Sequence, residues 1–302
     1  MKNNVVDYNS RIAILAGNGK LPIIVINELL KPKCNFVILC FDETNLQQFK
    51  QMDDLRMKNN IFSITLSNIP QILSILQQEK IEQVVCCGGV KFKGLNNLNI
   101  FNPKFIMTNF FITKYLFQAL FSKQKGDNFL LTLVEKILHK IGCKVIAVQE
   151  IVPHILINEK DEKNASLSKQ YIKDAEYGAT ILSTISKFDI GQSIVIHDGR
   201  VLGVEGAEGT QQLIIRCGQY FKEITKIDTN KKHNFKKPIL IKKSKCNQSK
   251  KLDVPTIGEQ TIIDLIDNDF AGIFLEHNAV FILDREKIAE LCKKNAFFIK
   301  TI

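Results

Sequence analysis

The chain has 302 residues, of which 45% are hydrophobic and 24% are charged. This composition excludes a wholly disordered, collagenous or membrane-embedded protein, and the length predicts two domains. The net charge is +10, but nine lysines lie between Lys231 and Lys251, where no carboxylate occurs, so the rest of the chain is nearly neutral. A local excess of this kind indicates an anionic ligand or surface near one segment.

Strand and helix patterns alternate through the first 90 residues. Strands are expected at 11–16, 35–41, 61–66 and 83–87, and helices at 22–30 and 69–80. Glycines follow the first and fourth strands, as Gly17-Asn18-Gly19 and Gly88-Gly89. The alternation predicts a parallel sheet of Rossmann type, whose ligands bind beyond the carboxyl ends of the strands. These glycines and Asp42 are therefore expected on one edge.

The middle of the chain is predicted to be helical, at 105–123 and 129–141. Residues 105–121 are strongly apolar, but they include Asn109 and Lys114 and are fewer than the ~20 needed to span a bilayer. We expect a mostly buried helix, with an interfacial helix that touches lipid as the alternative. We place the domain boundary here, giving an N-terminal Rossmann-like domain at 1–138 and a C-terminal domain at 139–302.

The second half is predicted to be a mixed α/β domain. Strands are expected at 145–149, 193–197, 200–205 and 238–241, helices at 174–187, 210–217 and 261–267, and a further strand pair at 272–275 with 279–283. Asp198-Gly199 is a strong two-residue hairpin signal.

The cysteine pattern and the start of the chain predict a cytoplasmic protein. None of the eight cysteines forms a Cys-x-x-Cys pair, and a reducing compartment is the simpler interpretation. Met1 to Tyr8 are polar and lack the apolar stretch of a secretory signal.

Three segments carry candidate chemistry. The turn formed by residues 17–20 can place Lys20 beside a phosphate at the start of a helix. A purely structural turn explains this glycine-rich sequence equally well. Glu205 and Glu208 stand in a glycine-rich turn before Thr210, where oxygen ligands suit Mg²⁺ and helix capping is an equal alternative. Asp253 follows the lysine run, and we favour a phosphate role for Lys242 and Lys245.

Four segments together carry a family resemblance: AILAGNGKLP, GDNFLL, GQSIVIHDGRVLGVEGAEGT and LDVPTIGEQT. In this order and spacing they resemble the bacterial UDP-2,3-diacylglucosamine pyrophosphatases of the lipid A pathway, of the type unrelated to metallophosphoesterases. The resemblance implies a Mg²⁺-dependent hydrolase that forms 2,3-diacylglucosamine 1-phosphate and UMP. It also implies two domains with the active site at their interface, and attack by water on the phosphorus on the sugar side.

The resemblance also assigns roles to residues. Asp253 would activate water or bind metal, Glu208 would share the catalytic role, and Glu205, Glu208 and Asp253 would be the metal ligands. The predicted substrate-binding residues are Gly17, Asn18, Gly19, Lys20, Gly88, Gly89, Asp127, Lys242, Lys245, Thr210 and Thr256. Two positions depart from the family pattern, because Asn128 and Ser249 stand where the resemblance predicts acids.

The expected partner is a lipid-linked UDP-sugar. We expect peripheral contact with the cytoplasmic face of the inner membrane and no binding of nucleic acid. A homodimer is a possible assembly. Two other functions stay open. The departures at Asn128 and Ser249 would suit a catalytically impaired protein that binds nucleotide-sugar lipids. The lysine run would suit a nucleic-acid-binding module, although Phe235 is the one aromatic residue in it available for base stacking.

Overall fold

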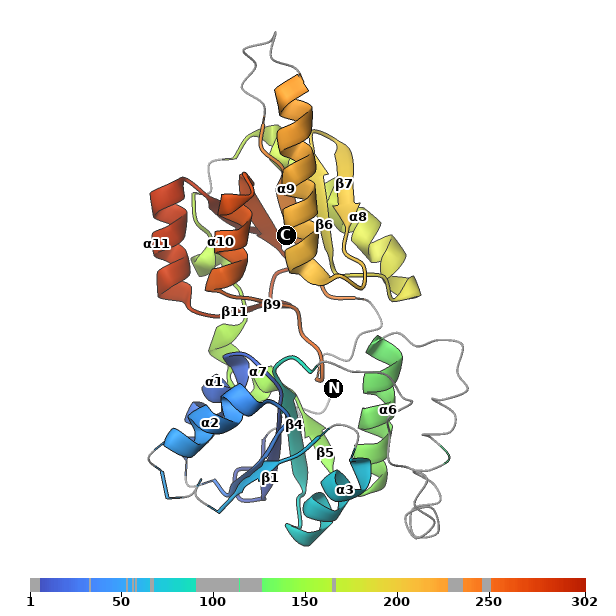
Figure 1. The fold of residues 1–302 in the computed structure, drawn as a ribbon, viewed down its shortest axis with the longest axis vertical. Helices are drawn as coiled ribbons and strands as arrows, with labels where there is room; N and C mark the ends of the chain where they lie inside the picture. Colours follow the sequence, from blue (N-terminus) through green and yellow to red (C-terminus); the bar gives the residue numbers. More distant parts are fainter. Residues whose placement is uncertain are drawn as a thin grey trace. The chain divides into compact units, whose positions relative to one another are not determined.

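The computed structural model describes residues 6–302 except 33, 53, 56, 58, 66–67, 91–113, 115–126, 165–166, 228–235 and 246–250. The chain divides into two compact units (Figure 1). The first contains Met1–Pro153 and Ser249–Asp253, and the second contains His154–Gln248 and Val254–Ile302. The chain therefore passes from the second unit to the first at Ser249 and back to the second at Val254.

The first unit is built on a parallel sheet with the strand order β3-β2-β1-β4-β5. Its strands are β1 (Ile12–Ala16), β2 (Phe36–Cys40), β3 (Ile61–Ser63), β4 (Gln83–Cys87) and β5 (Lys144–Ile146). This is the strand order of a Rossmann sheet, so the predicted fold class is confirmed. The reversal of order falls between β1 and β4, where ligands of such sheets bind.

Helices cover both faces of this sheet. They are α1 (Leu21–Leu30), α2 (Glu43–Gln51), α3 (Ile69–Gln78), α6 (Asp127–Lys140) and α7 (Val148–Ile151). Side chains of α3 and α6, such as Leu76 and Leu138, pack with Val37 and Val84 in one core. Figure 1 shows α1 and α2 on the opposite side of the strands. Burial on both faces explains why the strands are continuous apolar runs.

The first unit extends beyond the expected boundary. Residues 138 and 139 fall inside α6, and β5 then pairs in parallel with β4. Residues 145–149, expected as a strand of the second domain, instead contribute to β5 and to α7, which contacts α1. Because β5 satisfies the outer hydrogen-bonding groups of β4, the unit continues to Pro153.

The second unit contains a mixed sheet with the order β12-β10-β8-β6-β7. Its strands are β6 (Ser193–His197), β7 (Arg200–Val204), β8 (Ile239–Lys242), β10 (Gly272–Leu275) and β12 (Phe298–Thr301). β6 is antiparallel to β7 and β8, whereas β8, β10 and β12 are parallel. Asp198 and Gly199 both have positive φ, as the predicted hairpin turn requires. The mixed α/β prediction is confirmed.

Alternating side chains divide the core of this sheet in two. Ile194, Ile196 and Phe274 pack under α8 (Lys169–Ile185). On the other face, Val195, Leu240 and Ile273 pack under three helices, α9 (Gly209–Ile227), α10 (Glu259–Asp267) and α11 (Arg285–Asn295). The sheet whose β7 and β8 ends lie at the candidate residues Glu205 and Lys242 is therefore packed on both faces.

One predicted pairing is wrong. β10 does not pair with the strand that follows it, because β10 is buried on both faces and lies between β8 and β12. Instead, β11 (Phe281–Ile282) forms a separate two-stranded parallel sheet with β9 (Thr256–Ile257).

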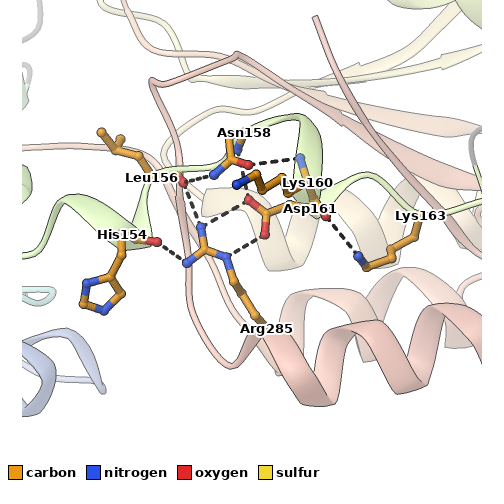
Figure 2. A network of polar contacts seen from close by, with 7 residues as sticks. All are labelled: His154, Leu156, Asn158, Lys160, Asp161, Lys163 and Arg285. Carbon is orange, nitrogen blue, oxygen red and sulfur yellow. Dashed lines mark hydrogen bonds and ion pairs between the residues drawn. The ribbon is translucent and has the colours of Figure 1, made fainter.

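An arginine clamp fixes the start of the second unit (Figure 2). Arg285, at the start of α11, donates from Nε to Asp161 Oδ1 (2.6 Å) and from Nη2 to Asp161 Oδ2 (3.1 Å). It also donates to the carbonyl oxygens of Leu156 (2.7 Å) and His154. Bidentate pairing of this kind sets position as well as energy, so residues 154–161 are held against α11.

Among the described residues, no helix is both long and apolar enough to cross a membrane. The apolar segment 105–121 lies outside the described residues except for Lys114.

Candidate functional site

The predicted glycine edge of the first unit is built by close contact of two loops. The Gly17 N–H donates to the Cys87 carbonyl oxygen (2.8 Å), and Asn18 and Gly89 exchange both backbone hydrogen bonds (2.8 and 3.1 Å). A Cβ on Gly17 would lie 2.4 Å from the Gly89 carbonyl oxygen. Gly88 has a φ of +84°, and a Cβ there would lie 2.5 Å from the Asn18 carbonyl oxygen. These glycines are required for backbone approach.

A buried asparagine holds this loop, and the sequence reasoning missed it. Asn45 is 4% exposed, and its side-chain amide donates to the carbonyl oxygens of Gly17 (2.7 Å) and Gly19 (3.1 Å). Its own N–H donates to Asp42, the N-cap of α2 (2.9 Å). The available signal was an Asp-x-x-Asn spacing directly after a buried strand, which predicts a helix start at the sheet edge.

Gly19 and Lys20 form the open part of the same loop. Gly19 has a φ of +90°, and a Cβ there would meet nothing within 4 Å. Lys20 is the N-cap of α1 and makes no side-chain capping bond, with proline in the first turn of the helix. The first N–H groups of a helix can bind an anion, so this is the part of the edge that a phosphate can approach.

In the second unit, three of the predicted residues form one buried polar cluster. Thr210 Oγ1 donates to Glu205 Oε1 (2.9 Å) and accepts from Lys242 Nζ (2.8 Å). Glu205 is 8% exposed and Lys242 is 5% exposed. The cluster joins the ends of β7 and β8 to the start of α9. A buried ammonium group and a buried carboxylate compensate one another here through the threonine hydroxyl.

Neighbouring backbone groups fix Glu205. Its N–H donates to the Ser193 carbonyl oxygen (2.9 Å), and its Oε2 accepts from the Gln192 N–H (3.3 Å). A Cβ on Gly191 would lie 2.0 Å from the Glu205 carbonyl oxygen, so this position has to be glycine. Both carboxylate oxygens of Glu205 accept hydrogen bonds from the protein.

Glu208 takes a different partner. It is exposed, and its Oε1 accepts from Arg216 Nη2 (3.0 Å) and Nε (3.3 Å). Its own backbone N–H and the Arg216 guanidinium hold the pKa of the Glu208 carboxyl below its ordinary value. Although it is only three positions after Glu205 in the sequence, Glu208 forms a surface ion pair outside the buried cluster.

Lys245 follows β8, and Thr256 lies in the separate two-stranded sheet. Lys245 Nζ pairs with Asp189 Oδ1 (2.7 Å), and its side chain is 11% exposed. Thr256 belongs to β9 and donates to the Val254 carbonyl oxygen (3.1 Å). Asp127 begins α6 of the first unit, and its side chain and that of Asn128 lie outside the described residues, as does Ser249.

Asp253 groups with the first unit. Leu252 packs against the core under α3 and α6, and Lys251 Nζ lies 4.0 Å from Glu135 Oε1 of α6. Asp253 follows directly and is half-buried. The predicted metal ligands therefore come from both units, with Glu205 and Glu208 in the second.

Within the second unit, Glu205 and Glu208 bond to different partners. In the described part of the chain, no group of three or more His, Cys, Asp or Glu side chains could hold a metal ion. Glu205 is already satisfied by protein donors, and the Lys242 ammonium supplies the positive charge beside it. As it is bonded here, the Glu205 carboxylate does not fit Mg²⁺, which needs oxygen ligands that remain available to it.

The cysteines play no evident chemical role. The seven described cysteines are free, and six of them are buried. Burial raises the pKa of Cys86 to about 12 and that of Cys217 and Cys292 to about 11. These thiols stay protonated at neutral pH and behave as small hydrophobic groups.

Two family models match almost the whole chain. The LpxI N-terminal domain matches residues 11–155, and the LpxI C-terminal domain matches residues 158–300. The chain belongs to the LpxI family. The division between the LpxI domains falls beside Pro153 and His154, where the two compact units divide. The resemblance seen in the four sequence motifs is confirmed.

A curated member of the LpxI family is similar over nearly its full length. The UDP-2,3-diacylglucosamine pyrophosphatase LpxI of Caulobacter vibrioides is 23% identical over 294 residues, which cover 96% of each chain.

Proposed function

We propose that this protein hydrolyses the pyrophosphate bond of UDP-2,3-diacylglucosamine, giving 2,3-diacylglucosamine 1-phosphate and UMP for lipid A synthesis. The observation that carries the proposal is the match of both LpxI domains, in order, along the chain, together with the activity named for the relative from Caulobacter vibrioides. The buried Glu205–Thr210–Lys242 cluster supports it, because it provides a fixed ammonium group at a sheet edge.

Lys242 and Thr210 are the proposed phosphate-binding groups of the second unit. The pyrophosphate carries negative charge on its non-bridging oxygens, and a desolvated ammonium group stabilises such charge more strongly than one in water. Glu205 orients Thr210 by accepting its hydroxyl hydrogen bond, and Thr210 in turn accepts from the Lys242 ammonium group. In the first unit, Gly19 and Lys20 at the start of α1 are the proposed contacts for a phosphate oxygen.

Asp253 is the proposed base. Its carboxylate would accept a proton from water as the water oxygen bonds to the phosphorus on the sugar side. The bond from that phosphorus to the bridging oxygen breaks, and its electron pair leaves with UMP. A carboxylate within hydrogen-bond reach of the attacking water can orient that water and accept its proton in the transition state.

Mg²⁺ dependence is part of the proposal and rests on the family resemblance. The ion would supply charge to the pyrophosphate oxygens when bound. Both oxygens of Glu205 are bonded to protein donors, so the roles of Lys242, Thr210 and Asp253 do not depend on an ion held by Glu205. Activity measured after EDTA treatment and then over a Mg²⁺ titration tests this part, and full activity in EDTA would contradict it.

The test of the site compares two aspartates. Asp253→Asn removes the proposed base with little change in volume, and we expect kcat/KM for UMP release to fall by about 10²-fold or more. Asp269→Asn is the matched control, because Asp269 pairs with surface lysines and has a positive φ that asparagine also adopts. Thermal unfolding of both variants checks that they fold.

The outcomes separate the alternatives. Full activity of Asp253→Asn would contradict the assignment of the base. Tight binding of UDP-2,3-diacylglucosamine by the wild-type protein with no turnover in Mg²⁺ would favour the impaired binding protein suggested by Asn128 and Ser249.

A further inference from the structure

One turn of the second unit exposes large apolar side chains. Phe188 is 67% exposed and Ile190 is 43% exposed. They follow α8, in a 3₁₀ turn (Ser186–Phe188) and the residues after it. Isolated exposed apolar residues are common and need no explanation, but two of them at one turn beside a candidate site suggest a contact surface.

The turn is held rigidly. Asp189 has a φ of +59°, a left-handed conformation, and its carboxylate accepts from Lys245 (2.7 Å). The Ser186 hydroxyl donates to the Ser183 carbonyl oxygen (2.8 Å). Gly191 lies against the backbone of Glu205. Phe188 is therefore presented to solvent on a fixed support, so little conformational entropy is lost when a partner covers it.

Cationic groups surround the apolar side chains. The Lys187 ammonium lies 5.2 Å from the centre of the Phe188 ring. Lys245 and Lys243 are on the adjacent segment, where the Lys243 N–H donates to the Gln192 carbonyl oxygen (2.9 Å). The facing carboxylates are Asp189, paired with Lys245, and Glu276, paired with Lys243. The charges of Lys245 and Lys243 are compensated by these carboxylates, so the excess positive charge at the turn is that of Lys187.

This surface adjoins the buried cluster. Gln192, two residues after Ile190, donates from its N–H to Glu205 Oε2 (3.3 Å), and Glu205 bonds to Thr210. If the function proposed above holds, the pyrophosphate of a lipid substrate lies at the level of the headgroups while its acyl chains lie in the bilayer. A protein that binds such a pyrophosphate has to present an apolar, cationic surface next to the phosphate site.

We propose that the turn formed by residues 186–190 is a membrane-docking surface that inserts Phe188 and Ile190 among the lipids of an anionic bilayer. Lys187 is close enough to contact the headgroup phosphates. The combination is that of an interfacial anchor, in which apolar side chains enter the acyl boundary and basic ones remain with the headgroups. The inference rests on the proposed lipid substrate, but its test does not require hydrolysis.

The absence of tryptophan from the chain allows a direct test. Phe188→Trp places a single tryptophan, which can be excited selectively, at the docking surface, and Tyr220→Trp places one on α9 at a side chain that is 51% exposed. Vesicles of phosphatidylcholine with phosphatidylglycerol, free of any UDP-lipid, are added to each variant. We expect the emission of Phe188→Trp to shift to shorter wavelength and that of Tyr220→Trp to remain unchanged.

Vesicle flotation supplies the second measurement. Phe188→Ser with Ile190→Ser should reduce the partition coefficient about tenfold, because burial of one phenylalanine is worth at least that factor. Tyr220→Ser should leave it unchanged. The proposal is overturned if the wild-type protein does not float, if the double variant floats equally well, or if Phe188→Trp is shifted without vesicles in proportion to protein concentration, which would indicate a second copy of the chain.

Loss of hydrolysis alone would not overturn the proposal. A protein that binds the vesicles through Phe188 but does not release UMP would support the docking surface and contradict the proposed function.

Discussion

The glycine edge of the first unit and the buried cluster of the second are two ways to build a ligand-binding edge on a sheet. The glycine edge is made of backbone, since Gly17, Asn18 and Gly89 meet with almost no side-chain volume between them. The buried cluster is made of charged side chains, since Glu205 and Lys242 compensate one another through Thr210. The first should therefore be sensitive to added volume, and the second to a removed charge.

The largest effect on stability is expected at Lys242. Lys242→Met removes the ammonium group and leaves the Glu205 carboxylate buried without charge compensation, so the free energy of unfolding should fall by about 3–5 kcal/mol. Urea denaturation measures it. Lys243→Met, the next residue, breaks an ion pair with Glu276 that is partly exposed, and should cost about 1 kcal/mol or less. Equal losses in the two variants would show that the cluster is not held by charge.

A smaller effect is expected from added volume at the glycine edge. Gly17→Ala forces the Gly89 carbonyl away, and we expect a loss of about 3 kcal/mol, the upper part of the range for overpacking. Gly19→Ala is the control, because its Cβ would have no atom within 4 Å. The expected loss of stability comes only from the positive φ and is about 1 kcal/mol. Thermal unfolding of both variants checks the order. If Gly19→Ala were the more damaging, close approach of the loops would not be the reason for glycine at position 17.

The smallest effect concerns the pH dependence of stability at Glu208. Its folded-state pKa is lowered, so the stability it contributes is present above its unfolded pKa and is lost as pH falls through the folded pKa. Glu208→Gln should therefore be slightly less stable than wild type near neutral pH, and the two should converge in acid. Urea titrations from neutral pH down to about pH 3, below the ordinary Glu pKa, measure the difference. A difference that grows as pH falls would contradict the assigned pairing.

The elements that could be predicted are those fixed by local pattern. β4 and β10 have the predicted bounds, because each is an apolar run that ends at a polar or glycine residue. The glycine edge was predicted from the glycines that directly follow the first and fourth predicted strands. The distinction between Glu205 and Glu208 could not be predicted, since residues three apart in a turn face the interior or the solvent according to how the hairpin packs on α9.

Long-range packing decided the remaining elements. Asn45 bonds to carbonyl oxygens 26 and 28 residues away, and no spacing in the sequence marks those partners. The pairing of β11 with β9 rather than β10, and the inclusion of β5 in the first unit, likewise depend on which edges remain open after the sheets form.

The most direct measurement is hydrolysis of UDP-2,3-diacylglucosamine in H₂¹⁸O, with both products analysed by mass spectrometry. Attack on the phosphorus on the sugar side predicts UMP without label and 2,3-diacylglucosamine 1-phosphate carrying one ¹⁸O atom on its phosphate. Recovery of intact substrate in the presence of Mg²⁺ would contradict the proposed activity, and label in UMP would contradict attack on the phosphorus on the sugar side.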